Sequence, residues 1–489
     1  MNRRDFLKIA GGSAAAFSLG GCLENNMISG GKKKKPNIVL IMADDVGYGD
    51  LGCYGDTNLV PTPNIDKLAS QGVRFSDAYV TAPVCGPCRY GMFLGAYQQK
   101  FGIQWNWSCW SKIPGYPNET IDDTRIPSQQ ELMTEPLEDA GYVSGLVGHW
   151  GLPCYPQTSF DESMSVIHYV ADYWPDETGH YGGVDEDIAY GEFKDIKWGP
   201  EREGDEYLTD RLGRQAVEFI DRHKDEPFFL YLGFNAPHSP MQAKNSLKDK
   251  VAHLPSEALK FYGAMLLSMD ENVGKVVEAL DERGLREDTI VVFISDNGPT
   301  YAYNVKWPKE WPKELLGSAG ELRGYKGQFL EGGIRIPLIM SWPGQLENGS
   351  VYEKPVSALD FYPTFCNAAG AEVPSGTHLD GVDLMPYLKG KKDGSPHDIL
   401  FWYSDDRGAV RKGRWKLYVN RDVVRLCDLK NDIGETTDLS SEYPQVRDAL
   451  LKEFEEFRNS MPAPLNPDLY EEHKDAFIKE YQIFSESGE

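Results

Sequence analysis

Two cysteines and an arginine lie within one five-residue segment, Cys85-Gly86-Pro87-Cys88-Arg89. As Cys-Gly-Pro-Cys, the segment is typical of a redox site in which two thiols alternate between dithiol and disulfide. As Cys-x-Pro-x-Arg, it has a second interpretation, in which Cys85 acts without the second thiol. If the proline lies in the first turn of a helix, positions 85 and 89 share one helix face. The two hypotheses predict different enzymes, and residues elsewhere in the chain must decide between them.

Acidic pairs follow two of the most apolar segments. Asp44-Asp45 comes after the run IVLIM, and Asp296-Asn297 comes after TIVVFI. Both runs are short, continuous and β-branched, a pattern typical of strands buried on both faces of a parallel sheet. Either polar pair alone would be interpreted as an ordinary turn. Together they place three carboxylates and an amide at one sheet edge, which predicts a site for a hard cation, Ca²⁺ or alternatively Mg²⁺, and not for zinc.

Two histidines and a lysine are further candidates for the site. His238 follows the apolar run 227–232, and His149 follows the run 143–147. Lys326 lies in the segment Arg-Gly-Tyr-Lys-Gly, whose glycines permit close approach to a ligand. In isolation a histidine is more often structural and a turn lysine more often solvated. At strand ends beside the acidic pairs, we expect the two histidines to contact a ligand. For Lys326, the segment LRGYKGQFLEGG in which it lies favours the same role.

The elements that must position these residues alternate along the chain. Helix-like segments at 206–224 and 256–284 lie between the apolar runs. This alternation predicts a doubly wound α/β sheet, in which ligands bind beyond the carboxyl ends of the strands. After residue 370 the pattern changes to short strand candidates and a charged helix at about 442–459. We therefore predict a large domain at 36–370 and a smaller α+β domain at 371–489.

The first 35 residues are predicted to be a targeting segment and a tether. Arg3-Arg4 precedes a stretch of small apolar residues, which resembles a twin-arginine export signal, and Leu-Gly-Gly-Cys22 resembles a bacterial lipobox. Together they predict a protein of the bacterial cell envelope, on its periplasmic or outer surface, lipid-anchored at Cys22 after twin-arginine export. We expect contact with the membrane only through this anchor.

The net charge and two tryptophan-containing segments indicate which kinds of partner the chain can bind. The chain has 489 residues and a formal charge of −25, which argues against nucleic-acid binding by bulk attraction. An anionic substrate must therefore meet a locally positive pocket. Segments 104–112 and 303–314 carry tryptophan near lysine and are candidates for stacking on sugar rings, although packed loops are an equally good interpretation.

Several ordered motifs show a family resemblance. PNIVLIMADDVGYGDLGCYG, TAPVCGPCRYGMFLGAY, GFNAPHSP, FISDNG, LRGYKGQFLEGGIRIP and SALDFYPTFCNAAG occur in this order between residue 36 and about 370. They resemble the motifs of the formylglycine-dependent sulfatases of the alkaline phosphatase superfamily. AVRKGRWKLY and LCDLKNDIGETTDL resemble the second domain of that family. The resemblance thus implies an alkaline-phosphatase-like fold and a sulfuric ester hydrolase.

Site roles follow from the resemblance. Cys85 would be oxidised to formylglycine by a formylglycine-generating enzyme, and the aldehyde hydrate would attack sulfur and then expel sulfate. Arg89 would stabilise the hydrate, while His238 and Lys326 would bind sulfate or move protons. The metal would be held by Asp44, Asp45, Asp296 and Asn297.

Three residues depart from the family pattern. His149 stands where a lysine is usual, and Gly151 where many members have histidine. Cys88 replaces a serine or alanine. We assign His149 to the site all the same, because a histidine can donate to the hydrate and to sulfate.

Sulfated saccharides or polysaccharide fragments are the predicted substrates, because a lipid-anchored envelope hydrolase is suited to scavenging. Three alternatives stay open. The chain could be a phosphoesterase of the same superfamily, although it lacks a histidine-rich metal set. The departures at positions 149 and 151 would also suit a binding protein that has lost catalysis. A thiol oxidoreductase is the third, but it leaves the acidic pairs unexplained.

Overall fold

The computed structural model describes residues 35–55, 60–105, 130–152, 159–168, 171–175, 181–182, 184–185, 205–301 and 314–464. Its largest feature is a nine-stranded sheet with the order β12-β2-β11-β8-β1-β7-β4-β5-β6. Strands β8, β1, β7, β4 and β5 are parallel, whereas β11 and β6 are antiparallel to their neighbours. The strands are β1 Asn37–Ala43, β2 Val73–Phe75, β4 Val143–His149, β5 Glu162–Ile167, β6 Val184–Asp185, β7 Phe228–Gly233, β8 Thr289–Ser295, β11 Leu338–Ser341 and β12 Ser350–Tyr352.

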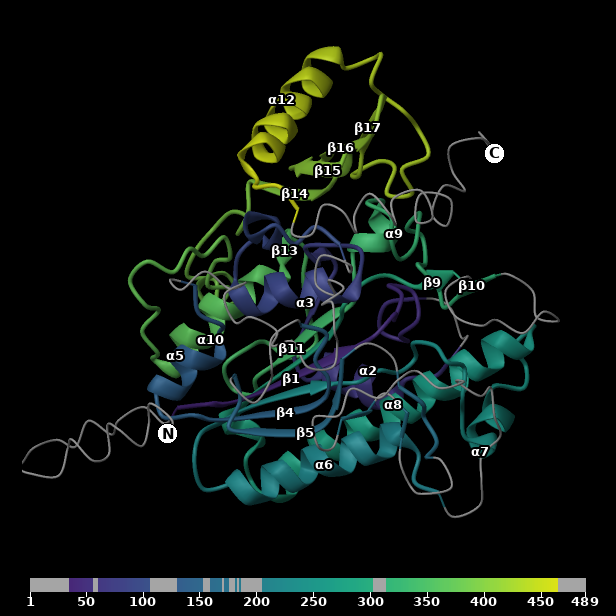
Figure 1. Cartoon of the computed structure of the whole chain (residues 1–489), viewed down its shortest axis with the longest axis vertical. Coiled ribbons are helices and arrows are strands. Elements are labelled where there is room, and N and C mark those ends of the chain that lie inside the picture. Colours follow the sequence, from purple (N-terminus) through teal and green to yellow (C-terminus); the bar gives the residue numbers. More distant parts are fainter. Residues whose placement is uncertain are drawn as a thin grey trace, which may run out of the picture. The chain divides into compact units, whose positions relative to one another are not determined.

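Helices pack on both faces of this sheet, which explains why its central strands are apolar throughout. Along β1, Leu40 and Met42 point into one core, and Val39 and Ile41 into the other. The first core contains α3, α5 and α10, and the second contains α2, α6 and α8 (Figure 1). These helices are α2 Pro63–Ser70, α3 Cys85–Leu94, α5 Thr134–Asp139, α6 Leu208–His223, α8 Glu257–Glu282 and α10 Phe361–Ala369. The predicted doubly wound α/β sheet is confirmed.

Short elements connect these layers. The helical ones are η1 Gln98–Phe101, α7 Asn245–Lys248, η4 Asp249–Val251, η5 Arg286–Asp288, α9 Glu331–Ile334, η6 Ala358–Asp360 and α11 Met385–Leu388. The short strands form two pairs, β9 Thr300–Tyr301 with β10 Leu315–Leu316 and β3 Ala78–Tyr79 with β13 Val356–Ser357. The small helix α9 matters most for the site, because it directly follows the segment that carries Lys326.

A four-stranded antiparallel sheet and one helix form the smaller C-terminal domain. The elements are β14 Ile399–Ser404, β15 Arg407–Lys412, β16 Trp415–Asn420, β17 Val423–Asp428 and α12 Pro444–Ser460. Val410 and Leu417 pack against α12 on one face, while Trp402 joins the core of the large sheet on the other. Trp402 Nε1 donates to the carbonyl of Val80 at 2.6 Å. The predicted α+β character is confirmed, whereas the boundary at 370 stays a prediction.

The predicted export and lipoprotein segment lies outside the described residues except for Lys35. Among the residues that are described, no helix is long and apolar enough to cross a membrane.

Candidate active site

The two acidic pairs meet at the carboxyl edge of the large sheet. Ala43 pairs with Ser295 in the parallel register of β1 and β8, so the residues that follow each strand lie level with one another. The backbone N–H of Asp45 donates to Asp296 Oδ1 at 3.3 Å, and Asn297 Nδ2 donates to Asp45 Oδ1 at 2.7 Å. The structure therefore brings together all four residues predicted to hold the metal.

Arg89 links the helix that begins at Cys85 to these carboxylates. Its side chain is fully buried. Nε and Nη2 donate to Asp296 Oδ2 at 3.1 and 2.7 Å, and Nη2 reaches Asp44 Oδ2 at 3.4 Å. Nη1 donates to the carbonyl of His149 and to the hydroxyl of Tyr231. The guanidinium thus has a carboxylate or neutral acceptor for each nitrogen, which fixes its plane.

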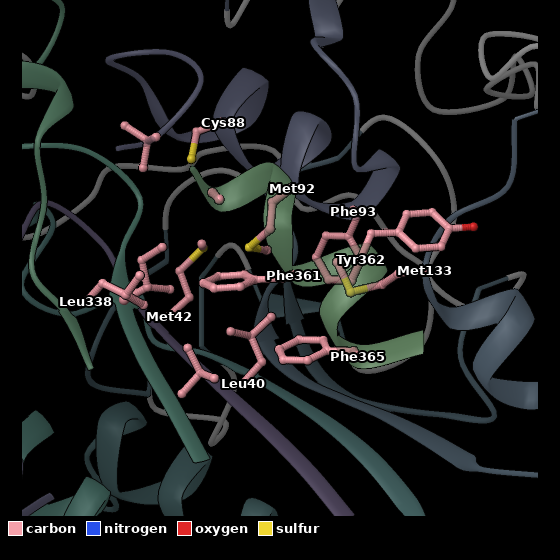
Figure 2. Packing of buried hydrophobic residues seen from close by; sticks show 14 of the residues in the cluster. Leu40, Met42, Cys88, Met92, Phe93, Met133, Leu338, Phe361, Tyr362 and Phe365 are labelled. Carbon is pink, nitrogen blue, oxygen red and sulfur yellow. The ribbon is translucent and has the colours of Figure 1, made fainter. Parts of the chain in front are cut away.

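Cys85 is the first residue of α3, and its Sγ belongs to a group with carboxylate oxygens of Asp44 and Asp296 that lie within 4.8 Å of one another. Burial raises the pKa of its thiol to about 12, despite the nearby positive charge of Lys326. Burial also raises the pKa of Cys88, which packs in the apolar core near Met92 and Phe361 (Figure 2). Because a thiolate is the reactive form of cysteine, neither residue is poised as a redox thiol.

His149 ends β4 and points at the same carboxylates. Its Nδ1 lies 2.6 Å from Asp44 Oδ2, while Nε2 has no hydrogen-bond partner among the described residues. Burial and the charge of Arg89 lower the pKa of His149 to about 4, against the opposing effect of Asp44. Gly151 has a φ of +72°, and a Cβ there would lie 2.9 Å from Arg89 Cδ and 3.4 Å from His149 Nε2. A glycine at 151 therefore leaves room for the arginine and the imidazole.

His238 and Lys326 complete the cluster from two other loops. His238 Nε2 lies 3.8 Å from Asp45 Oδ2, and its Nδ1 lies 2.7 Å from the carbonyl of Ser239. Lys326 Nζ donates to Asp45 Oδ1 at 2.6 Å. Although burial opposes it, the negative charge of Asp45 raises the pKa of Lys326 well above its ordinary value. Every residue predicted for the site thus lies in one connected cluster, although the residues come from segments far apart in the chain.

The oxygen atoms of this cluster suit a hard cation. Asp44 Oδ1 and Asn297 Oδ1 are buried and have no hydrogen-bond partner among the described residues. Two orphaned acceptors beside Asp45 and Asp296 are costly unless a donor or a cation satisfies them. An oxygen-only ligand set fits Ca²⁺ or Mg²⁺. The residues present therefore fit the predicted metal.

Tyr231 is a site residue that sequence reasoning misses. Its hydroxyl accepts from Arg89 Nη1 at 2.6 Å and donates to the carbonyl of His149 at 3.2 Å. It lies inside the apolar strand β7, where a tyrosine is indistinguishable by pattern from an ordinary core residue. Of the proposed sugar-stacking segments, only Gln104, Trp105 and Glu314 lie within the described residues.

Comparison with known proteins decides the family. A model described as Sulfatase matches residues 36–371 of the chain, which includes every residue of the cluster. The chain belongs to the sulfatase family. A second model, described as the C-terminal part of N-sulphoglucosamine sulphohydrolase, matches residues 320–460. The chain is accordingly a sulfuric ester hydrolase by family, and the thiol oxidoreductase hypothesis is set aside.

Individual sulfatases are similar to this chain in sequence and in structure. Arylsulfatase A of Homo sapiens is 32% identical over 414 residues, covering 79% of this chain and 75% of that protein. The uncharacterized sulfatase YdeN of Escherichia coli strain K12 is 32% identical over 415 residues, covering 76% and 69%. The crystal structure of Ps i-CgsB superposes with a TM-score of 0.74 at 30% identity and covers 92% of this chain and 98% of that one. A phosphonate monoester hydrolase of Agrobacterium radiobacter, at 20% identity and a TM-score of 0.59, shares the fold.

Proposed function

We propose that this sulfatase hydrolyses sulfate esters of saccharides, with Cys85 converted to formylglycine. The observation that carries the proposal is the position of Cys85, at the start of α3 and among the carboxylates of Asp44 and Asp296. A buried thiol with a pKa of about 12 is a poor nucleophile, which supports conversion of Cys85 as the step that makes this position reactive. A formylglycine hydrate supplies one hydroxyl that attacks sulfur and a second that expels sulfate.

The residues around position 85 have separable roles. Arg89, whose side chain Asp296 holds in place, stabilises negative charge next to residue 85. Because the pKa of His149 is about 4, its ring is neutral at pH 7, and its one N–H lies on Nδ1 and donates to Asp44 Oδ2. Nε2, which lacks a partner among the described residues, is then an acceptor for an O–H group and not the donor that the sequence predicts. Lys326 and His238 lie on the Asp45 side, where they bind the sulfate group or protonate the oxygen that leaves.

A divalent cation held by Asp44, Asp45, Asp296 and Asn297 would neutralise a sulfate oxygen. Ca²⁺ is the ion we propose, because the set has three carboxylates and the orphaned oxygens of Asp44 and Asn297.

Sulfated saccharides are the substrates we propose. A structure of Ps i-CgsB, 29% identical with a TM-score of 0.74, contains k-i-k-neocarrahexaose. The chain carries a formal charge of −25, yet two cationic side chains, Arg89 and Lys326, are buried in the site. The three carboxylates of the site outweigh these two charges, but a divalent cation bound there would make the site positive and would favour an anionic group where the rest of the protein repels it. We therefore propose k-i-k-neocarrahexaose as the first compound to test.

Maturation and location are part of the same proposal. A formylglycine-generating enzyme would modify Cys85 inside the cell, and twin-arginine export would carry the folded protein to the envelope, where Cys22 is lipid-anchored. Export of a folded chain suits this order of events, because the thiol at 85 is converted before it meets an oxidising compartment.

A non-catalytic sulfatase-like binding protein is the second candidate, and the pairing of His149 with Gly151 favours it. One experiment separates the two. The protein is produced together with a formylglycine-generating enzyme, the mass of the peptide that contains residue 85 is measured, and inorganic sulfate is assayed with a panel of sulfated saccharides. The proposal expects an aldehyde at 85 and sulfate release that a Cys85→Ala variant lacks. An aldehyde with binding but without release would support the second candidate, and an unmodified thiol without release would overturn the proposed function.

A further inference from the structure

The segment that carries Lys326 is a closed loop whose two ends meet. It begins at Arg323 and ends at Glu331, the first residue of α9. The backbone N–H of Gly332 donates to the carbonyl of Arg323 at 2.6 Å, which joins the ends directly and leaves the loop little freedom at its base. A Cβ on Gly332 would clash with the carbonyl of Gly324. The backbone at Gly332 therefore packs directly against the backbone at Gly324, with no room for a side chain between them.

A residue of the C-terminal domain holds both ends of this loop. Glu435 Oε2 accepts a hydrogen bond from the backbone N–H of Glu331 at 2.6 Å, and the carbonyl of Glu435 accepts one from Arg323 Nη1 at 3.1 Å. Glu435 is 1% exposed and has a φ of +51°. It belongs to the segment LCDLKNDIGETTDL, to which the proposed chemistry assigns no role.

Lys416 of β16 joins the same group. Its Nζ donates to Glu331 Oε1 at 2.8 Å and lies 2.9 Å from Glu435 Oε1. The other oxygen of Glu331 accepts from the hydroxyl of Tyr79 at 2.6 Å. Lys416 and Glu331 are fully buried. Buried ion pairs contribute little net stability, because the cost of desolvation offsets their attraction, but they do fix geometry.

The opposite side of the loop lies against the active site. The backbone N–H of Lys326 donates to the carbonyl of Pro299 at 2.9 Å, and that of Gly327 donates to the carbonyl of Pro83 at 2.8 Å. Pro83 precedes Cys85 by two residues, and Pro299 follows Asn297 by two. The loop is thus held between the catalytic cluster on one side and the pair Lys416–Glu435 on the other.

We infer that Glu435 and Lys416 are positioning residues for Lys326. Their contacts are with the two ends of the loop, at Arg323 and Glu331, and they act on Lys326 by holding those ends in place. This inference rests on the proposed function, in which Lys326 acts on the sulfate ester. It assigns the C-terminal domain a part in catalysis.

The test uses the full-length matured protein with Glu435→Gln and Lys416→Met. Asp438→Asn is the matched control, because Asp438 lies three residues beyond Glu435 and its carboxylate accepts from the backbone of Leu426 and Ser440. We expect the first two variants to lose on the order of tenfold or more in kcat with little change in KM, since small misplacements of a catalytic group are costly. Amide hydrogen exchange should become faster in residues 323–333 and stay unchanged in β1 and β8. The control should resemble the wild type in both measurements.

The role of Glu435 and Lys416 can still be tested if a variant fails to fold or if the wild type is inactive. If Lys416→Met fails to fold, Arg323→Met removes the donor to the carbonyl of Glu435 and should give a smaller loss of kcat with the same local rise in exchange. Folded variants with unchanged kcat and unchanged exchange in 323–333 would overturn the inference. If the wild type releases no sulfate, the proposed function fails, and hydrogen exchange alone still decides whether Glu435 and Lys416 hold the loop.

Discussion

Arg89 Nη2 lies 2.7 Å from Asp296 Oδ2, and neither side chain is exposed to solvent. This pair joins the helix that begins at Cys85 to the strand end that supplies two of the proposed metal ligands. The charge on each partner depends on the other, because a buried carboxylate without a partner is strongly disfavoured. The position of the proposed nucleophile, residue 85, and the proposed binding of a cation are thus coupled through one arginine.

Replacing Arg89 by methionine should expose this coupling. The carboxylates of Asp296 and Asp44 would lose their buried partner, and we expect the metal-free protein to be destabilised by about 3–5 kcal/mol. Added Ca²⁺ should restore more stability to Arg89→Met than to the wild type, because the variant site is more negative. Thermal denaturation with and without Ca²⁺ measures both effects, and equal Ca²⁺-induced shifts in the two proteins would contradict the predicted metal site.

Gly151 should be needed for activity more than for folding. Gly151→Ala places a Cβ 2.9 Å from Arg89 Cδ at a φ of +72°, whereas Gly141→Ala meets nothing within 4 Å at a φ of +85°. Both variants should lose about 1–2 kcal/mol of stability through the left-handed backbone, and Gly151→Ala should lose more, because a displaced guanidinium weakens the buried pair with Asp296. Only Gly151→Ala should lose most of its sulfate release, because it displaces the guanidinium. Parallel activity and denaturation measurements decide this, and similar activities in the two variants would show that the space at 151 is not used.

Cys88 should behave as a core residue. It packs with Met92 and Phe361 in an apolar cluster (Figure 2). Cys88→Ser would bury a hydroxyl that can use the backbone of Thr81, the partner of the Cys88 thiol, and we expect a loss of only about 1 kcal/mol in the free energy of unfolding. Conversion of Cys85, followed by peptide mass, should be unaffected. A Cys85–Cys88 disulfide in the purified wild type would contradict this interpretation.

The pair His397–Asp360 should make stability depend on pH. His397 Nε2 lies 2.8 Å from Asp360 Oδ1. Burial opposes it, but attraction to Asp360 and their hydrogen bond raise the pKa of His397 above its ordinary value. The folded state therefore binds this proton more tightly than the unfolded state. Its contribution is fully present below the unfolded-state pKa of about 6.5 and is lost as pH rises through the raised folded value.

His397→Gln tests whether the contribution of His397 to stability is lost, and not gained, as pH rises. The difference in unfolding free energy between wild type and variant should be larger at pH 6 than at pH 9, by about 1–3 kcal/mol for a hydrogen bond to a charged group. Urea denaturation at the two pH values measures it. A difference that grows with rising pH would show that the pKa is shifted in the opposite direction.

The central part of the fold and site is predictable because it depends on local signals. The four apolar runs predicted as strands correspond to β1, β4, β7 and β8, and polar residues at their carboxyl ends meet because parallel strands share that edge. The antiparallel strands β11 and β6 have no comparable signal. They are short, and their pairing is set by partners distant in sequence.

Long-range contacts account for what single-sequence patterns do not show. Tyr231 has the pattern of a core residue and becomes part of the site only because Arg89, 142 positions away, reaches its hydroxyl. Lys416 looks like an ordinary lysine in a short strand, yet it is buried against Glu331, 85 positions away. Neither contact has a periodicity or spacing that a single sequence displays.

Hydrolysis of saccharide sulfate esters by the cluster around residue 85 can be measured as inorganic sulfate. The substrates are k-i-k-neocarrahexaose and a panel of other sulfated saccharides, and the proteins are the wild type and Cys85→Ala, both produced with a formylglycine-generating enzyme. We predict release by the wild type from at least one saccharide and only background release by Cys85→Ala. Equal release by the two proteins, or none by a wild type shown to carry the aldehyde, would contradict the proposed function.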